Sequence, residues 1–180
     1  SNADLLIEQA KKFQPNAVVI VDDASYQKVK TSLWDEPIKV FSGSDSLQQI
    51  VTSSDIDVVL TALVGYAGLI PTVKAIEAGK HIALANKETL VVAGEIITKL
   101  AEEKGVNIYP VDSEHSALAQ CLLSGDAKEV ATLILTASGG PFLSRSAASL
   151  VNVTPDEACA HPNWQMGRKI SVDSATMMNK

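Results

Sequence analysis

Short apolar runs alternate with amphipathic segments along the first hundred residues of the chain. The runs have the length of buried strands, and they lie at 17–21, 38–41, 57–63 and 81–85. The segments around them have helical periodicity, and they lie at 5–13, 25–33, 47–51, 64–79 with Gly79 as a C-cap, and 89–104. Apolar strands that alternate with helices indicate a parallel sheet covered on both faces. The pattern predicts an α/β fold, a doubly wound (Rossmann-like) parallel sheet whose ligands bind at the carboxyl ends of the strands.

The second part of the chain changes character after about residue 105. Strands are predicted at 106–111 and 130–135, with a helix over 115–123 between them. The C-terminal stretch HPNWQMGRKISVDSATMMNK mixes Pro162, Gly167 and Trp164 with many polar side chains. Such a mixture favours a loop that closes over a polar ligand, followed by the start of a helix.

The turn that usually binds a dinucleotide is missing from the expected place. A dinucleotide-binding unit opens with a strand, a glycine-rich turn and a helix, but no such run precedes Asp4. Gly65 and Gly68 follow a later strand, where they indicate either close strand–helix packing or contact with a cofactor. We therefore expect a doubly wound sheet that is incomplete at its N-terminal side. Residues 1–3, Ser-Asn-Ala, have the sequence of a cleaved expression tag.

Composition excludes several classes of protein. The chain has 180 residues, of which 46% are hydrophobic, which is enough for a substantial core. The formal net charge is −6 with both signs interspersed, so no basic surface for nucleic acid is expected. The longest apolar run, 58–73, is broken by glycine and proline and is too short to span a membrane. Cys121 and Cys159 lack a metal-ligand partner, which is typical of a reduced, cytoplasmic protein.

Asp112 and Glu114 form the first candidate site. Both follow the strand 106–111, and residues two apart on an extended backbone share a face, so their carboxylates would converge. Two carboxylates at one point favour a hard divalent cation, magnesium or manganese, over zinc. The alternative is that Asp112 or Ser113 only caps the following helix.

Three further groups are ambiguous when taken singly. The Ser138–Gly139–Gly140 turn has the composition of an anion-binding nest, but taken alone this composition is more typical of an ordinary turn. His161 is compatible with a structural role. Lys87 follows a predicted strand, where it would either pair with a substrate anion or face solvent.

Four strings taken together resolve this ambiguity. ALANKETLV, PVDSEHSA, LTASGGPF and HPNWQMGRKISVDSATMMNK occur in that order, and the chain resembles the 1-deoxy-D-xylulose 5-phosphate reductoisomerases over residues 4–180. The resemblance implies an enzyme of isoprenoid biosynthesis that uses NADPH and Mg²⁺ or Mn²⁺. It implies rearrangement of 1-deoxy-D-xylulose 5-phosphate, followed by reduction of the branched aldehyde phosphate to 2-C-methyl-D-erythritol 4-phosphate. A homoserine-dehydrogenase-like oxidoreductase would share the fold but would leave PVDSEH and HPNWQMGRK unexplained.

The resemblance also assigns roles to residues. It implies metal ligation by Asp112 and Glu114, and catalytic roles for Lys87, Asp112 and Glu114. The implied substrate-binding residues are Lys87, Ser113, Glu114, Ser138, His161, Ser174, Asn179 and Lys180. The implied lid, about 142–168, contains Trp164 and Met166 and is expected to be mobile without ligand. Asn86, Glu88 and Gly167 are implied to lie near the cofactor. The expected partners are a small phosphorylated sugar and a second subunit in a homodimer, with neither nucleic acid nor membrane.

Helical spacing and chain length complete the expectations. Ser174 and Asn179 are five residues apart and so about 140° apart on a helix, so either the helix starts at Ser174 or it ends before Asn179; we favour the first. The resemblance implies an internal part of the enzyme, with 4–109 as the remainder of the NADPH-binding domain and 110–180 as the first part of an α/β catalytic domain. The alternative to an active enzyme is therefore a catalytically silent folded core that binds ligand weakly at most.

Overall fold

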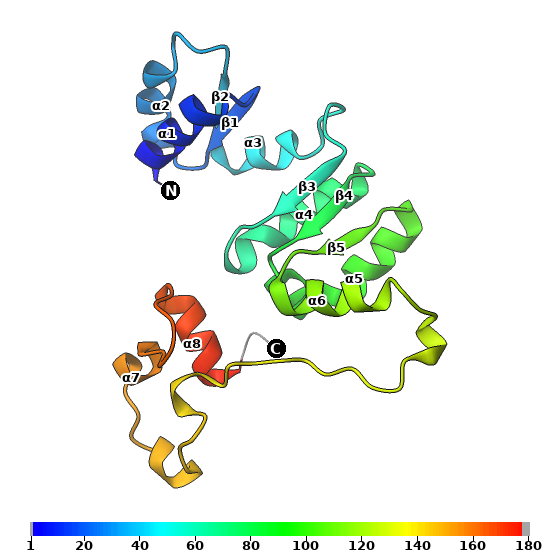
Figure 1. Ribbon diagram of the computed structural model, residues 1–180. Coiled ribbons are helices and arrows are strands. Elements are labelled where there is room, and N and C mark those ends of the chain that lie inside the picture. Colours follow the sequence, from blue (N-terminus) through cyan, green and yellow to red (C-terminus); the bar gives the residue numbers. More distant parts are fainter. Residues whose placement is uncertain (1, 178–180) are drawn as a thin grey trace. The chain divides into compact units, whose positions relative to one another are not determined.

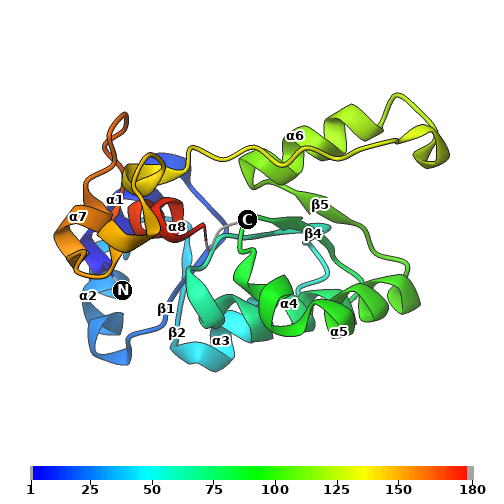
Figure 2. The same ribbon diagram turned by 90° about the horizontal axis from the view of Figure 1, so that it is seen from below.

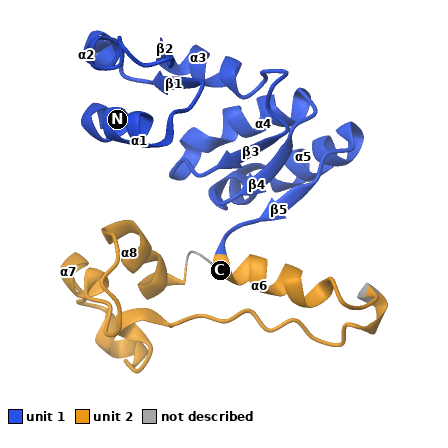
Figure 3. Cartoon of the chain, turned by 45° about the horizontal axis from the view of Figure 1, so that its top comes forward, with its two compact units in different colours: residues 1–112 blue, residues 113–180 orange. Residues whose placement is uncertain are grey.

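The computed structural model describes residues 2–177 and divides into two compact units, Ser1–Asp112 and Ser113–Lys180 (Figure 3). The division falls three residues after the domain boundary expected from the sequence, between 109 and 110. Each unit is described by itself. None of the helices in the described range is both long enough and apolar enough to cross a membrane.

The first unit opens with a small two-layer motif. Its elements are α1 (Ala3–Phe13), β1 (Ala17–Ile20), η1 (Asp23–Ser25), α2 (Tyr26–Ser32) and β2 (Lys39–Ser42). The two strands are parallel, with Ala17 opposite Lys39 and Ile20 opposite Ser42. Val18 and Ile20 of β1 pack against Val29 and Leu33 beneath the two helices. Asn2 caps α1 by accepting a hydrogen bond from the Leu5 N–H at 3.1 Å.

Three more strands follow in the same unit (Figure 1). The elements are α3 (Gly43–Ile50), β3 (Val58–Thr61), η2 (Gly65–Gly68), α4 (Leu69–Glu77), β4 (His81–Leu84), α5 (Glu88–Lys104) and β5 (Ile108–Pro110). They form a parallel sheet in the order β3-β4-β5, with Leu84 opposite both Thr61 and Pro110. Gly79 follows α4 with a left-handed φ of 76°, which confirms its prediction as the residue that ends the helix.

The expected α/β fold with parallel strands is confirmed, and within the first unit the helices α4 and α5 cover one face of this second sheet. Ile82 and Leu84 are buried on the covered face, where α4 and α5 pack (Figure 2). On the other face Val58, Leu60 and Tyr109 are 50%, 61% and 50% exposed. The reason is the handedness of the connections: successive right-handed crossovers that advance in one direction place their helices on the same side.

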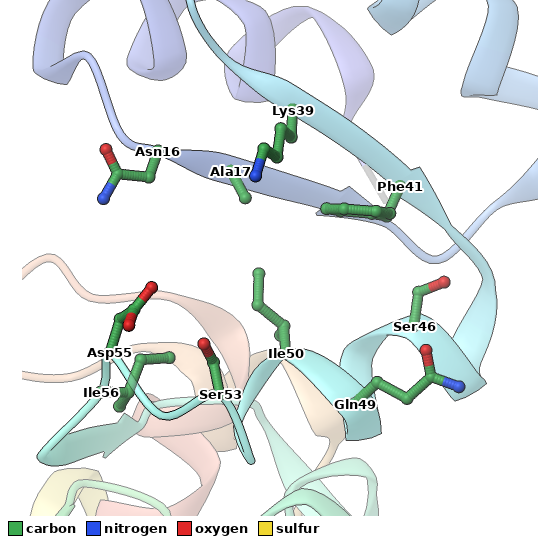
Figure 4. A pocket seen from close by; sticks show the side chains of 10 residues that line it. All are labelled: Asn16, Ala17, Lys39, Phe41, Ser46, Gln49, Ile50, Ser53, Asp55 and Ile56. Carbon is green, nitrogen blue, oxygen red and sulfur yellow. The ribbon is translucent and has the colours of Figure 1, made fainter.

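The parallel direction of the strands is confirmed, but they do not form one sheet. Within residues 2–177, β1 and β2 pair only with each other, and β3 pairs only with β4. A cavity of about 470 Å³ lies between the face of β1–β2 that α1 and α2 leave uncovered and the segment 46–56 (Figure 4). Its lining includes Ala17, Phe41 and Ile50 and contains no residue that the sequence assigned to a site. The periodicity of single segments predicts strands but not which strands are neighbours.

The second unit is mainly helical and irregular. Its elements are α6 (Ser113–Leu122), η3 (Ala127–Glu129), η4 (Gly140–Phe142), η5 (Ala147–Leu150), α7 (Pro155–Cys159) and α8 (Arg168–Thr176). The predicted strand at 130–135 is wrong, because this segment has no regular structure and Leu133 and Ile134 are 59% and 75% exposed. A strand needs a neighbouring backbone for its hydrogen bonds, and no strand of the described residues pairs with this segment.

Candidate functional site

An ion pair joins the carboxyl ends of two neighbouring strands. Lys87 follows β4 and Asp112 follows β5, and the pairing of Leu84 with Pro110 brings these two strand ends together. The Lys87 Nζ lies 2.6 Å from the Asp112 Oδ2, and the two side chains are 25% and 16% exposed. A partly buried cation and anion at this edge can bind the oxygens of a small anionic ligand or of a metal–ligand complex.

Asn86 and Glu88 flank Lys87 at the start of α5. Asn86 is buried and its side-chain amide is hydrogen-bonded to the backbone around it. Glu88 is half-buried and is the first residue of α5. Lys87 therefore protrudes from a fixed backbone, at a position where the sequence alone left solvent exposure as the alternative.

The second predicted carboxylate belongs to a helix rather than to an extended segment. Strand β5 ends at Pro110 and α6 begins at Ser113, so Glu114 lies in the first helical turn. The alternation of side chains along a strand, from which convergence of Asp112 and Glu114 was predicted, therefore does not apply to this pair. The Glu114 Oε2 accepts a hydrogen bond of 2.9 Å from the Ser113 hydroxyl.

The donor chemistry of these two carboxylates fits a hard cation in part. Asp112 and Glu114 offer oxygen ligands, as magnesium and manganese prefer. In residues 2–177, however, no three His, Cys, Asp or Glu side chains are grouped so that they could hold an ion. Two carboxylates leave most of a six-oxygen shell to water or to other ligands.

The predicted anion-binding turn and His161 come together in the second unit. The Ser138 Oγ accepts a hydrogen bond from the Gly140 N–H at 3.3 Å and lies 3.1 Å from the His161 Nε2. The His161 Nδ1 accepts from the Asn163 and Trp164 N–H groups, both at 3.2 Å. Because Nδ1 is an acceptor, the neutral ring carries its proton on Nε2 and donates it to Ser138. The Ser138 oxygen then accepts two hydrogen bonds, and its hydroxyl hydrogen is left to donate to another acceptor.

The backbone around this turn is packed too tightly for side chains. Gly139 and Gly140 both have left-handed φ values, 75° and 62°. A Cβ on Gly140 would lie 2.7 Å from the carbonyl carbon and oxygen of Ser174 and from the N of Ala175. The turn therefore rests directly on α8, and it brings Ser138 next to the helix that carries Ser174. Sequence reasoning identified these two serines but missed this contact, which a pair of adjacent glycines can indicate.

The residues of the implied lid lie near this turn or at the start of α8. The Trp164 ring stacks on the His161 ring at a centroid distance of 4.9 Å and an angle of 19°, and Trp164 is 57% exposed. Met166 is half-buried, and Gly167 is the N-cap of α8. The lid role of 142–168 and its mobility stay predictions.

Helix α8 corrects the expected position of Ser174. The helix spans Arg168–Thr176 and its C-cap is Met177, whose φ is 60°, so Ser174 lies near its C-terminal end. The favoured expectation, a helix that starts at Ser174, is wrong, and the alternative, a helix that ends before Asn179, is confirmed. Arg168, the last residue of the predicted lid, is the first residue of this helix. Asn179 and Lys180 lie outside the described residues.

Parallel strands with connecting helices and polar groups at the strand ends define an α/β protein of the Rossmann-like class. Comparison with protein families defines the class further. Residues 1–94 match the model "1-deoxy-D-xylulose 5-phosphate reductoisomerase", and residues 108–180 match the model of the C-terminal domain of the same enzyme. The chain belongs to the 1-deoxy-D-xylulose 5-phosphate reductoisomerase family.

Individual relatives agree with this assignment. The chain is 57% and 54% identical to the 1-deoxy-D-xylulose 5-phosphate reductoisomerases of Bacteroides fragilis and Porphyromonas gingivalis, over its whole length and 46% of theirs. It thus spans about half the length of these relatives. It matches a crystal structure of DOX-P reductoisomerase with NADPH, fosmidomycin and magnesium at a TM-score of 0.85 and 41% identity, covering 99% of this chain and 47% of the other. The Zymomonas mobilis enzyme with NADPH matches at a TM-score of 0.86 and 40% identity, covering 99% and 45%.

Proposed function

We propose that this chain contributes to the NADPH- and divalent-metal-dependent conversion of 1-deoxy-D-xylulose 5-phosphate to 2-C-methyl-D-erythritol 4-phosphate. The observation that carries the proposal is the Lys87–Asp112 ion pair, which lies at the strand ends of a chain that matches reductoisomerases over its whole length. The conversion is a step of isoprenoid biosynthesis, and we place it in the cytoplasm of the cell.

The groups that follow β5 and β4 would act on the oxygen-rich end of the substrate. Asp112 and Glu114 would hold Mg²⁺ or Mn²⁺, and Ser113, between them, would contact the substrate. When bound, the metal polarises substrate oxygens and NADPH supplies the hydride. The Lys87 ammonium would bind a substrate oxygen on which negative charge develops, an interaction that strengthens in the low dielectric of a partly buried site.

The serine-rich groups of the second unit would hold the substrate phosphate. The Ser138 hydroxyl accepts a hydrogen bond from His161 and would donate its own hydrogen to a phosphate oxygen, and Ser174 lies on the helix against which the turn packs. Asn179 and Lys180 would also bind the phosphate, as the resemblance to the family implies. Donors fixed in this way bind a phosphate without reorganising first, which favours affinity and orientation.

The remaining assignments concern the lid, the cofactor and assembly. Trp164 and Met166 would cover the substrate and exclude water, with 142–168 as the lid. Asn86, Glu88 and Gly167 would lie near the nicotinamide cofactor. We propose that the active enzyme is a homodimer that binds a small phosphorylated sugar and does not bind nucleic acid.

A chimera tests the proposal. The matching segment of the Bacteroides fragilis reductoisomerase, 57% identical over this chain, is replaced by these 180 residues. NADPH absorbance is then followed with substrate and manganese. We expect activity within about tenfold of the unmodified enzyme, and a loss of at least a hundredfold in Lys87→Ala, which removes a charge-assisted contact.

Lys99→Ala is the matched control, because Lys99 lies on the same helix α5, is 78% exposed and pairs only loosely with Glu103 at 3.9 Å. It should leave kcat and KM unchanged. A chimera that folds and binds NADPH but turns over no substrate would contradict the proposed function.

A second candidate is that the chain by itself is a silent folded core. The uncovered sheet face with Val58 and Leu60 and the unpaired segment 130–135 favour it, because both expose apolar groups that a complete domain would bury. Assays of the chimera and of the isolated chain, carried out side by side, distinguish a contribution to the enzyme's activity from a catalytically silent core.

A further inference from the structure

Asn86 has the most deeply buried side chain among the candidate-site residues that the structure describes. It follows β4, it is 2% exposed, and its backbone N–H donates to the Thr61 carbonyl at 2.8 Å. A side-chain amide has two N–H donors and an oxygen that can accept two hydrogen bonds. The partners of these four hydrogen-bonding positions determine whether the Asn86 side chain is available to bind a ligand.

The amide oxygen is hydrogen-bonded to the first turn of α5. The Asn86 Oδ1 accepts from the Thr89 N–H at 2.9 Å and from the Thr89 hydroxyl at 2.7 Å. A side-chain oxygen that accepts from the backbone N–H three residues later is the geometry of a helix N-cap. Asn86 thus fixes the start of α5, and Lys87 is the next residue. The Lys87 carbonyl in turn accepts from the N–H of Leu90 at 3.0 Å.

The amide nitrogen is hydrogen-bonded to a different segment. The Asn86 Nδ2 donates to the carbonyls of Leu63 and Gly65, the latter at 2.9 Å. These carbonyls belong to the connection between β3 and α4, where Gly65 has a left-handed φ of 69°. One side chain therefore joins the connection after β3 to the helix that follows β4.

Gly68, at the end of the same connection, packs against the Asn86 side-chain amide. A Cβ on Gly68 would lie 2.7 Å from the Asn86 Nδ2 and 2.9 Å from its Cγ. The Gly68 carbonyl accepts from the buried Thr72 hydroxyl at 2.7 Å, which holds the glycine in place. The backbone at Gly68 has φ −78°, a conformation open to any residue, so the contact with Asn86 rather than backbone strain requires glycine here.

We infer that Asn86 is a positioning residue that fixes Lys87 by clamping the 63–68 connection to the start of α5, and that its side chain is not a ligand of the cofactor. All four hydrogen-bonding capacities of the amide are used by Leu63, Gly65 and Thr89. The cofactor can then contact only the backbone at this position. The inference rests on the proposed function only where it gives Lys87 a role in binding substrate.

The consequence for Lys87 follows from its place in the chain. Its backbone is fixed by the clamp and its ammonium by Asp112, 2.6 Å away, so both ends of the side chain are restrained. A lysine held in this way loses less conformational entropy when it binds a substrate oxygen than a mobile one. If the clamp loosens, the ion pair should loosen with it.

The first test uses two glycines in the 180-residue chain. Gly68→Ala adds a methyl group that must displace the Asn86 amide. Gly94→Ala, on α5, is the matched control, because its Cβ would meet only the Leu90 Cβ at an ordinary 3.9 Å. Amide hydrogen exchange at Thr89 and at residues 63–68 should accelerate at least tenfold in Gly68→Ala and stay unchanged at those positions in Gly94→Ala.

The Lys87 side-chain NMR signal tests the link to the ion pair. In Gly68→Ala the Lys87 Cε resonance should move toward its position in Asp112→Asn, where the ion pair is absent. Neither substitution places a new charge beside Lys87. A Lys87 signal that stays at the wild-type position while exchange at 63–68 accelerates would overturn the positioning role. Unchanged exchange at Thr89 would overturn the clamp itself.

Asn86→Asp gives a second, pH-dependent test with nearly the same shape. A carboxylate would face the carbonyls of Leu63 and Gly65, whereas the protonated acid can still donate one hydrogen bond. The folded state thus raises the pKa of the introduced carboxyl, so its penalty is small at low pH and grows as pH rises through that pKa. The nearby ionisable residues Lys87, Glu88 and Asp112 are present in both proteins. Comparison with wild type at each pH therefore isolates the effect of the introduced carboxyl group on stability.

The measured quantity is the difference in melting temperature between wild type and Asn86→Asp. It should widen steadily between about pH 4 and pH 7. Asn152→Asp, at an exposed position, should show no such trend. A difference that is the same at all pH values would contradict the hydrogen bonds assigned to the Asn86 nitrogen. All these measurements use the isolated chain and stand whether or not the proposed activity is found.

In the chimera, a further variant separates a positioning role of Asn86 from cofactor binding by its side chain. Thr89→Val, which removes one bond to the Asn86 oxygen, should lower kcat several-fold and leave the KM for NADPH within about twofold. A rise in the KM for NADPH with unchanged kcat would overturn the inference. An inactive parent chimera instead contradicts the proposed function, since the exchange and NMR measurements decide the clamp independently.

Discussion

At the scale of a single residue, Gly140 shows how tightly the candidate phosphate-binding turn packs against α8. Its left-handed φ of 62° and its contact with the backbone of Ser174 and Ala175 each require glycine. The neighbouring Ser138 owes its orientation to the Gly140 N–H and to His161. The adjacent glycines therefore position two serines from segments far apart in the chain.

Gly140→Ala should release this packing. A left-handed alanine costs about 1–2 kcal/mol, and the clash with the α8 backbone adds to that cost. We expect amide exchange at Ser174 and Ala175 to accelerate at least tenfold and the His161 ring signals to shift. Gly125→Ala is the control, since its Cβ would meet only the Glu129 Oε2 at 3.6 Å. Wild-type protection of α8 in Gly140→Ala would contradict the contact described.

Helix α7 shows at the scale of an element how a few polar groups hold five residues in place. The Thr154 Oγ1 accepts from the Glu157 N–H at 3.3 Å, and the Glu157 Oε2 accepts from the Thr154 N–H at 2.9 Å. These bonds form a capping box, and Arg145 adds an ion pair to Glu157 at 2.9 Å. Helix α7 in turn lies against η4 and α8.

The charge of Glu157 makes this cap sensitive to pH. The hydrogen bond from the Thr154 backbone, and next the one from Arg145, hold the pKa of Glu157 below its ordinary value of 4.5. The stabilisation is therefore present above about pH 4.5 and is lost as pH falls through the lowered pKa. Amide exchange at Glu157 and Ala158, compared at pH 6 and pH 3 after correction for intrinsic rates, should show protection only at the higher pH.

Glu157→Gln is the informative variant for this prediction. Glutamine can accept the Thr154 N–H bond but carries no charge, so the cap should persist with much less dependence on pH. An unchanged pH dependence in Glu157→Gln would assign the effect to another group.

At the scale of the whole molecule, the candidate metal site and the candidate phosphate-binding turn lie mainly in different units of the described chain. The chain spans about half of each relative, its second sheet has one uncovered face, and two predicted metal ligands lack a third acidic partner among residues 2–177. Each of these features weakens binding of a ligand that must be held at several points at once.

The isolated chain should therefore bind manganese weakly and reduce no substrate. Calorimetry should give an affinity at least a hundredfold below that of the full-length Bacteroides fragilis enzyme, because two carboxylates leave most of the metal shell to water. No NADPH oxidation above background is expected with substrate and manganese. Tight manganese binding that Asp112→Ala abolishes would contradict the affinity prediction and support the assigned ligand. Substrate-dependent NADPH oxidation that Glu114→Gln abolishes would contradict the prediction of silence.

Local pattern determined much of this protein. Aliphatic runs of strand length and helical periodicity predicted every described strand of the first unit and their parallel direction, because both depend on neighbours in the chain. Motif strings such as ANKET and PVDSEH identified the family and named Lys87 and Asp112, which the structure pairs. Asn86 is also of a residue type that is preferred at helix N-caps, and its Oδ1 accepts from the Thr89 N–H at the start of α5.

Only the tertiary structure decided the matters that depend on residues distant in the chain. The separation of the strands into two sheets, the uncovered face at Leu60 and the lack of a strand at 130–135 depend on which backbones are neighbours. The same holds for the Asn86 amide between two connections and for Gly140 against α8. Periodicity reports how one segment alternates between buried and exposed, whereas hydrogen-bond partners and close backbone contacts exist only once segments have been brought together.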